Sequence, residues 1–143
     1  MILAIDPGPE QSGWVLWSHK SSSVLESGVS DNDGLLHLVA DQSDIAVEMI
    51  ASYGMPVGAE VFETCVWIGR FMQASRGGFT RIFRRDVKLH LCGNARAKDA
   101  NVWQAIVDRY GPPGTKKKPG ALYGVRSHAR AALAVAITHG DSA

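Results

Sequence analysis

The stretch ILAIDPGPEQSG (residues 2–13) decides the fold, because it runs from a strand through a sharp turn into a second strand. Residues 2–5 are apolar and of strand-forming types, and the Pro-Gly pair after Asp6 predicts a turn. Gly13 then restarts a strand with the sequence WVLWS. Two interpretations of Asp6 are open here: it forms the turn, or its half-buried carboxylate belongs to a functional site at the strand end.

Outward from this turn, strand and helix signals alternate along the chain. We expect strands at 2–5, 14–18, 23–29, 44–50 and 79–84, and helices from Asn32 or Asp33 to Leu38 and at 56–75, 99–110 and 127–138, the last with Ser127 as its N-cap. Residues 87–92 predict another short strand, with a helix as the alternative. The order indicates an α/β domain with a mixed sheet that begins as an antiparallel meander.

Composition is that of an ordinary globular domain. The chain has 143 residues, 45% of them hydrophobic and 20% charged, with a net charge of +1. We therefore expect one domain over 1–143. The N-terminus lacks the features of a signal peptide and no apolar run is long enough to span a bilayer, so we expect no membrane partner. Cys65 and Cys92 fit no metal-site spacing, and we expect them reduced in a cytoplasmic protein.

Charge is distributed unevenly along the chain. Residues 1–63 hold ten acids and one base, whereas residues 76–130 hold thirteen bases and three acids. One interpretation is simple segregation of surface charge. The other is a nucleic-acid partner, because dense basic residues neutralise backbone phosphates and release their counterions.

Glu48 stands in an otherwise apolar strand, DIAVEMI (44–50). Glutamate is almost never fully buried unless it is paired or bound to metal, so the residue either faces solvent or takes part in a site. Adjacent parallel strands lie about 5 Å apart. Carboxylates of Asp6 and Glu48 on neighbouring strand ends could therefore share a hard cation such as Mg²⁺.

His128 lies in VRSHARAALAVAIT (125–138), where a helix of small apolar residues begins. A lone histidine there is commonly a surface or capping residue. Placed over the sheet end, it could instead ligate a metal, which suits Mn²⁺ better than Mg²⁺, or act as general base for an attacking water.

Basic residues supply candidate phosphate contacts, although any one of them could equally belong to a solvated face. The predicted DNA-binding set is Arg81, Arg84, Arg85, Lys88, Arg96, Lys98, Lys116, Lys117, Lys118, Arg126 and Arg130. Among the aromatic residues, we expect Trp14, Trp17, Trp67 and Phe71 in the core and regard Tyr53 and Tyr123 as the better candidates for stacking on bases. The apolar face of helix 56–75 comprises Val57, Val61, Cys65, Ile68 and Met72.

These pieces in this order resemble the RuvC-like Holliday-junction resolvases of the ribonuclease H-like superfamily, most of all the compact versions carried by bacteriophages and prophages. The opening ILAIDPGPEQSG and the closing SHARAALAVAITH carry the resemblance most specifically, and KLHLCGNARAKDANVWQAIVDRYG is similar to the basic middle region of such proteins. The resemblance implies a five-stranded mixed sheet, three antiparallel strands followed by two parallel ones, flanked by helices. It also implies a homodimer, for which helix 56–75 is the candidate element, and nicking of branched DNA with Mg²⁺ or Mn²⁺.

The resemblance also implies roles for individual residues. Asp6 matches the aspartate on the first strand that bridges the metals, and Glu48 matches the glutamate on the fourth strand. His128 stands where the family has an acid or sometimes a histidine. Ala131, three residues further on, departs from the pattern, because the family commonly has another aspartate there.

Three other functions are open at this stage. With Ala131 in place of an acid, the protein could bind DNA junctions without cutting them. It could be a nucleotide-binding fragment of the sugar-kinase or actin type, although the chain is short for that and lacks a second phosphate-binding glycine loop. It could also be a nuclease acting on flaps or on RNA.

Overall fold

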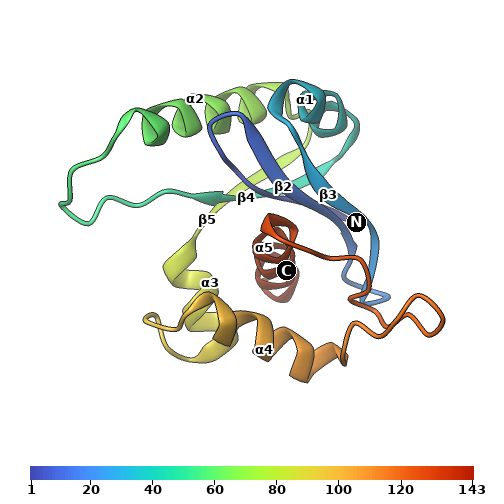
Figure 1. Ribbon diagram of the computed structural model, residues 1–143. Helices are drawn as coiled ribbons and strands as arrows, with labels where there is room; N and C mark the ends of the chain where they lie inside the picture. Colours follow the sequence, from blue (N-terminus) through green and yellow to red (C-terminus); the bar gives the residue numbers. More distant parts are fainter.

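The computed structural model describes residues 1–143 and is built on a five-stranded sheet with the strand order β3-β2-β1-β4-β5 (Figure 1). Strands β1 (Ile2–Asp6), β2 (Gln11–Ser18) and β3 (Ser23–Asp31) form the expected antiparallel meander. Strands β4 (Asp44–Met49) and β5 (Gly78–Phe83) run parallel to β1. The predicted α/β fold with a mixed sheet of three antiparallel and two parallel strands is confirmed.

Five helices cover both faces of the sheet. One face carries α1 (Asn32–Asp41) and α2 (Ala59–Ala74), and the other carries α3 (Arg84–Cys92), α4 (Asp99–Tyr110) and α5 (His128–Asp141) (Figure 1). The charge pattern follows these layers, because acids predominate on α1 and in the first turn of α2, whereas most basic residues of the second half lie on β5, on α3 and in the loops before and after α4. None of the helices is long and apolar enough to cross a membrane.

Alternation along β1 assigns each of its side chains to one of two cores. Leu3 and Ile5 pack toward α1 and α2, whereas Ile2 and Ala4 pack toward α5. Successive side chains of a strand point to opposite faces, so Asp6 continues the series that faces α5. The same parity holds on β4, where Ala46 packs toward α5.

Helix α5 lies directly on the sheet because its contact surface is made of small residues. Every residue of the run 132–138 is buried, and alanines recur through it. A Cβ atom at Gly13 on β2 would overlap the backbone of His128 at the start of α5. Glycine at this position therefore allows the first turn of α5 to meet the strand that pairs with β1.

Several predicted boundaries move in the structure. The second helix begins at Ala59 rather than at residue 56, and its buried face consists of Thr64, Ile68 and Phe71, so that Val57 and Met72 are exposed. Helix α5 continues to Asp141, and Ser127 at its N-cap position makes no side-chain capping bond.

The predicted strand at 87–92 is wrong, and the helical alternative is confirmed as the greater part of α3. Val87 and Leu91 lie one turn apart and both contact the core beneath α5. Gly93, at a φ of 69°, ends the helix in the left-handed conformation that favours glycine.

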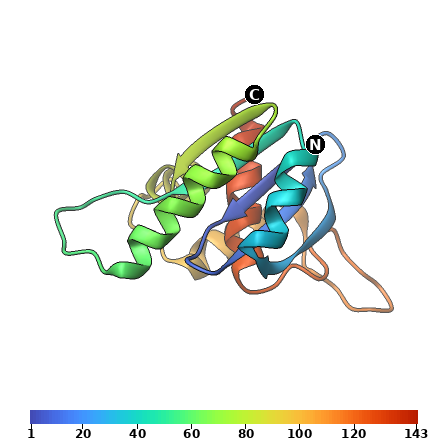
Figure 2. The same cartoon turned by 90° about the horizontal axis from the view of Figure 1, so that it is seen from above.

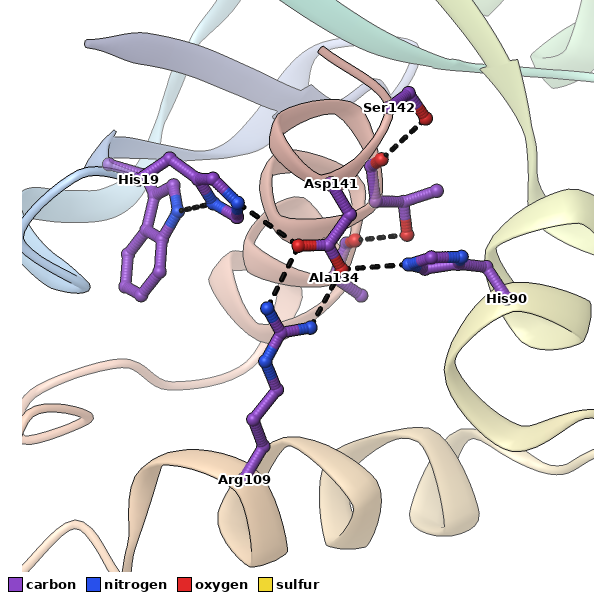
Figure 3. A network of polar contacts seen from close by, with 8 residues as sticks. His19, His90, Arg109, Ala134, Asp141 and Ser142 are labelled. Atoms are coloured by element: carbon purple, nitrogen blue, oxygen red, sulfur yellow. Dashed lines mark hydrogen bonds and ion pairs between the residues drawn. The ribbon is translucent and has the colours of Figure 1, made fainter.

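The far end of α5 is tied down by a cluster of polar contacts around Asp141 (Figure 3). The two Nη atoms of Arg109 donate to its carboxylate at 2.7 and 2.8 Å. The Nε2 atoms of His90 and His19 lie 2.7 and 3.0 Å from it. A side chain at Gly140 would overlap the His19 ring, so this glycine leaves room for the cluster. The cluster joins the turn after β2 to α3, α4 and α5.

The two ends of the chain lie at the same end of the sheet, where β1 begins (Figure 2). Strand β1 runs away from this end of the sheet toward Asp6, and α5 begins beside Asp6 and runs back. In the last turn of α5, His139 Nε2 lies 2.8 Å from Oδ1 of Asp44, the first residue of β4. Asp6 and His128 therefore meet at the opposite end of the sheet, where β1 ends and α5 begins.

Substituting Asp141 should destabilise the fold in a pH-dependent way. Its hydrogen bonds with Arg109 hold the Asp141 pKa well below the ordinary value, so the stability it contributes is present above about pH 4 and is lost as the pH falls further. We expect Asp141→Asn to lower the free energy of unfolding by about 2 kcal/mol at pH 7. Urea denaturation at pH 7 and under acid conditions measures the difference in the free energy of unfolding between Asp141→Asn and the wild type.

The control is Asp41→Asn, because Asp41 is exposed at the end of α1. We expect that variant to change stability by less than about 0.5 kcal/mol. An Asp141→Asn protein as stable as the wild type at pH 7 would show that the cluster is only a surface arrangement.

Candidate functional site

Asp6 and Glu48 lie side by side at the end of the sheet. The parallel register pairs Ile5 with Val47, so the next positions along the two strands are Asp6 and Glu48. Both side chains are largely buried, with 14% and 15% of their surface exposed. The two carboxylates lie on neighbouring strand ends as predicted, and Glu48 does not extend freely into solvent.

Burial and the neighbouring carboxylate make Glu48 a weak acid. Desolvation and the charge of Asp6 raise its pKa to about 7, against the opposing effect of the Arg84 guanidinium. The pair therefore concentrates more negative charge than one guanidinium balances near neutral pH. A cation bound between them would relieve that excess.

His128 is the first residue of α5 and lies at the same end of the sheet. Its Nδ1 lies 3.1 Å from Oδ2 of Asp6, while 70% of its side chain is exposed. A hydrogen bond from Nδ1 to the carboxylate leaves Nε2 as the free acceptor. Gly13 makes this approach possible, since a side chain there would displace His128.

The three residues line an open cleft of about 1160 Å³. Its walls come from the turn after β1, the beginning of α2, α3 and α4, and the first turns of α5. Ala131 also lines this cleft, one turn after His128, where it presents a methyl group rather than a carboxylate.

The side chains do not by themselves complete a metal cage. No group of three or more His, Cys, Asp or Glu residues converges closely enough to hold an ion. Mg²⁺, however, is often bound by only one or two protein carboxylates, with water and substrate phosphates completing its shell. The paired oxygen donors of Asp6 and Glu48 fit that kind of site, and the imidazole of His128 adds a donor acceptable to Mn²⁺.

Two residues of the cleft have roles that the sequence did not indicate. Arg84 is a predicted phosphate contact, but the structure places it between two carboxylates: Nη1 lies 3.0 Å from Oε1 of Glu48, and Nη2 contacts Asp99. Asp99 did not stand out in the sequence. The only available signal for Arg84 was its place just after β5, since Ile82 pairs with Glu48 in the parallel register.

The sharp turn after Asp6 is held by a buried polar chain that sequence reasoning also missed. Ser12 donates to the side-chain oxygen of Asn32 at 2.6 Å and accepts from the Gly8 backbone nitrogen at 3.1 Å. Asn32 returns a bond to the Gly8 carbonyl at 2.9 Å. Asn32 was a candidate helix cap, and its buried amide instead fixes the backbone that carries Asp6.

The other predicted phosphate contacts are divided between the cleft and the surface outside it. Lys88 and Arg130 line the cleft, and Arg130 also lies over the Trp103 ring at 4.3 Å. Lys116–Lys118 form the tip of a loop that projects beyond the start of α5 and is closed by a bridge between Gly114 and Pro119 (Figure 2). The remaining members of the predicted set are exposed outside the cleft, namely Arg81, Arg85, Arg96, Lys98 and Arg126.

The predicted division of the aromatic residues agrees with their burial. Trp14, Trp17 and Phe71 are buried, and Trp67 packs beside Phe71. Tyr53 and Tyr123 are exposed.

Comparison with known proteins assigns the fold. No protein-family model and no curated protein sequence matches the chain. The structure "Thermus thermophilus RuvC structure" matches with a TM-score of 0.67 at 22% identity, over 96% of this chain and 92% of that chain. T. thermophilus RuvC in complex with Holliday junction substrate matches with a TM-score of 0.70 at 18% identity, over 96% and 91% of the two chains.

The architecture is thus a ribonuclease H-like α/β fold. Within that class it is RuvC-like, as these two structures show over nearly the whole chain.

Removing the charge of Glu48 should stabilise the metal-free protein at high pH. A raised carboxyl pKa means that the folded state binds the proton more tightly, so Glu48 costs stability progressively between pH 4.5 and about 7. We expect Glu48→Gln to raise the free energy of unfolding by about 3 kcal/mol at pH 8 and to have little effect near pH 4.5. Urea denaturation in EDTA measures the difference.

Glu26→Gln, on exposed strand β3, provides the matched control and should leave stability unchanged at both pH values. If Glu48→Gln destabilises the protein equally at pH 8 and pH 4.5, the carboxylate is not strained by its surroundings.

Proposed function

We propose that the protein is a divalent-metal-dependent endonuclease that nicks four-way (Holliday) or other branched DNA junctions, with residues 1–143 acting as one nuclease domain. The observation that supports this best is the meeting of Asp6, Glu48 and His128 at one end of a RuvC-like sheet. One protein with this fold is described in complex with Holliday junction substrate. A cytoplasmic location, in a bacterial cell or a phage-infected host, accords with this function.

Asp6 and Glu48 are the proposed ligands of Mg²⁺ or Mn²⁺, with His128 as a further ligand or as the base. The bound cation supplies Lewis-acid stabilisation of charge on the phosphate and on the leaving oxygen. Asp6 also orients the imidazole through Nδ1 of His128. Nε2 then accepts a proton from the water that attacks phosphorus, and one P–O ester bond breaks. The exposure of His128 leaves that nitrogen accessible to water.

The basic residues are the proposed DNA-binding surface. Lys88 and Arg130 lie in the cleft, and Lys116, Lys117 and Lys118 extend from the loop between α4 and α5. Phosphate contacts position a duplex without reading its bases. Selection of a branched substrate would then depend on its shape, through the spacing of these contacts around the site.

Homodimerisation is part of the proposal, because a twofold dimer would offer one site to each of two symmetry-related strands of a junction. Helix α2 is the candidate contact. Phe62, Val66 and Met72 are exposed on it, and Gly69 between them has open space around it. Large apolar side chains gathered on one exposed helix are typical of an interface.

A junction-binding protein without nuclease activity is the second candidate function. The observation in its favour is Ala131, which faces the cleft without the carboxylate that the resemblance leads one to expect. On that interpretation Asp6 and Glu48 are retained for structure, and the basic residues alone provide affinity for DNA.

The proposed activity is tested with a labelled four-way junction incubated with Mg²⁺ or Mn²⁺. We expect nicking by the wild type and at least a 100-fold loss in Asp6→Asn and Glu48→Gln, because removal of one preorganised charge from a catalytic site commonly costs about that much. Junction binding in EDTA, measured by gel shift, should be kept. Asp41→Asn should cleave normally, and equal cleavage by all three variants would exclude this site.

Restoring a carboxylate at residue 131 separates the two candidate functions. If the site is catalytic, Ala131→Asp adds an oxygen donor one turn from His128 and should increase nicking at limiting Mg²⁺ by about tenfold, in line with one added charge-assisted contact. Initial nicking rates across a Mg²⁺ titration measure this effect. A wild type that binds junctions but stays inactive with every metal, and gains nothing from Ala131→Asp, would be a binding protein.

A further inference from the structure

Arg84 occupies an unusual place for a basic residue. Its guanidinium contacts the buried Glu48 with one Nη and the exposed Asp99 with the other. It is also the first residue of α3, where a positive charge meets the positive end of the helix dipole. The two carboxylates therefore hold the cation at a position that the local helix disfavours.

The two partners of Arg84 differ in what they can do. Glu48 lies at the floor of the cleft beside Asp6, whereas Asp99 begins α4 at the rim and has 74% of its side chain exposed. A guanidinium carries several donors in a fixed fork, so it can keep one carboxylate while it releases the other. Release of Glu48 needs no loss of the contact with Asp99.

We propose that Arg84 is the resident counter-ion of Glu48, that a divalent cation must displace it to bind, and that Asp99 retains the displaced guanidinium at the mouth of the cleft. This rests on the proposed function, because it takes the Asp6–Glu48 pair as the cation site. Arg84 is thus a positioning residue that lowers metal affinity in the free protein. Once displaced, its vacated donors face the cleft through which a DNA phosphate would enter.

The contact with Arg84 explains why the carboxyl pair can exist without metal. Two adjacent buried carboxylates repel each other, and Arg84 offsets part of that repulsion. Displacement of Arg84 by the metal also predicts opposite effects on metal affinity for substitutions of Arg84 and of Asp99. Removal of Arg84 frees Glu48 for the metal, whereas removal of Asp99 leaves the guanidinium with Glu48 as its sole carboxylate.

Mn²⁺ binding without DNA, followed by calorimetry and by the electron paramagnetic resonance signal of free Mn²⁺, tests the proposal at pH 7.5. We expect Arg84→Met to bind Mn²⁺ about tenfold more tightly and Asp99→Asn to bind it several-fold more weakly, as loss or gain of one charge-assisted contact would produce. Arg76→Met is the control, because Arg76 is an exposed arginine after α2 that lies outside both the cleft and the proposed DNA-binding set, and its loss should leave affinity unchanged.

A double-mutant cycle distinguishes displacement from a general effect of charge. If Asp99 acts only through Arg84, Asp99→Asn has no effect on Mn²⁺ affinity in the Arg84→Met background. If the two substitutions are additive, or if Arg84→Met binds Mn²⁺ no more tightly than the wild type, the proposal is overturned. Thermal unfolding checks that each variant is folded, and Arg84→Ala replaces Arg84→Met if the latter is not.

Glu48→Gln separates failure of this inference from failure of the proposed function. Loss of Mn²⁺ binding in Glu48→Gln together with unchanged affinity in Arg84→Met rejects the role of Arg84 and leaves the metal site standing. Mn²⁺ affinity that is unaffected by Glu48→Gln, or absent in the wild type and in Arg84→Met alike, rejects the site itself and the inference with it.

Discussion

The close contact between α5 and the sheet is the constraint on which the functional end of the molecule depends. Small residues bring the helix down onto β1 and β2, and Gly13 removes the one side chain that would hold its first turn away. Because the helix is fixed in rotation and height, His128 meets Asp6 at one end, while His139 and Asp141 are held at the other. A shift of α5 along its axis would break all of these contacts together.

The functional end is assembled against local preferences. Glu48 is buried beside another carboxylate, and Arg84 sits at the positive end of a helix. The remainder of the fold, with two apolar cores between which the side chains of β1, β2 and β4 alternate, provides the stability that tolerates these arrangements. Such local conflict confined to one cleft is typical of a site whose charges are completed by a ligand.

The sheet and the acidic pair follow from the sequence because both depend on short-range rules. Strand parity places Asp6 and Ala4 on one face, and the turn after Asp6 is marked by Pro7 and Gly8. Residues 87–92 were harder, because a short apolar run suits a strand or a helix until the surface it contacts is known. The contact of Arg84 with Asp99 could not be predicted, since Asp99 is fifteen residues away and meets it only because α3 and α4 pack together.

The antiparallel course of β1 and α5 has a practical consequence. Both chain ends lie at the end of the sheet that is opposite the cleft. A molecule anchored to a bead, a chip or a fusion partner by either end would therefore hold its cleft toward the solution. One preparation attached at the N-terminus and another at the C-terminus would present the same face to a long DNA, so immobilised and tethered formats can be compared directly.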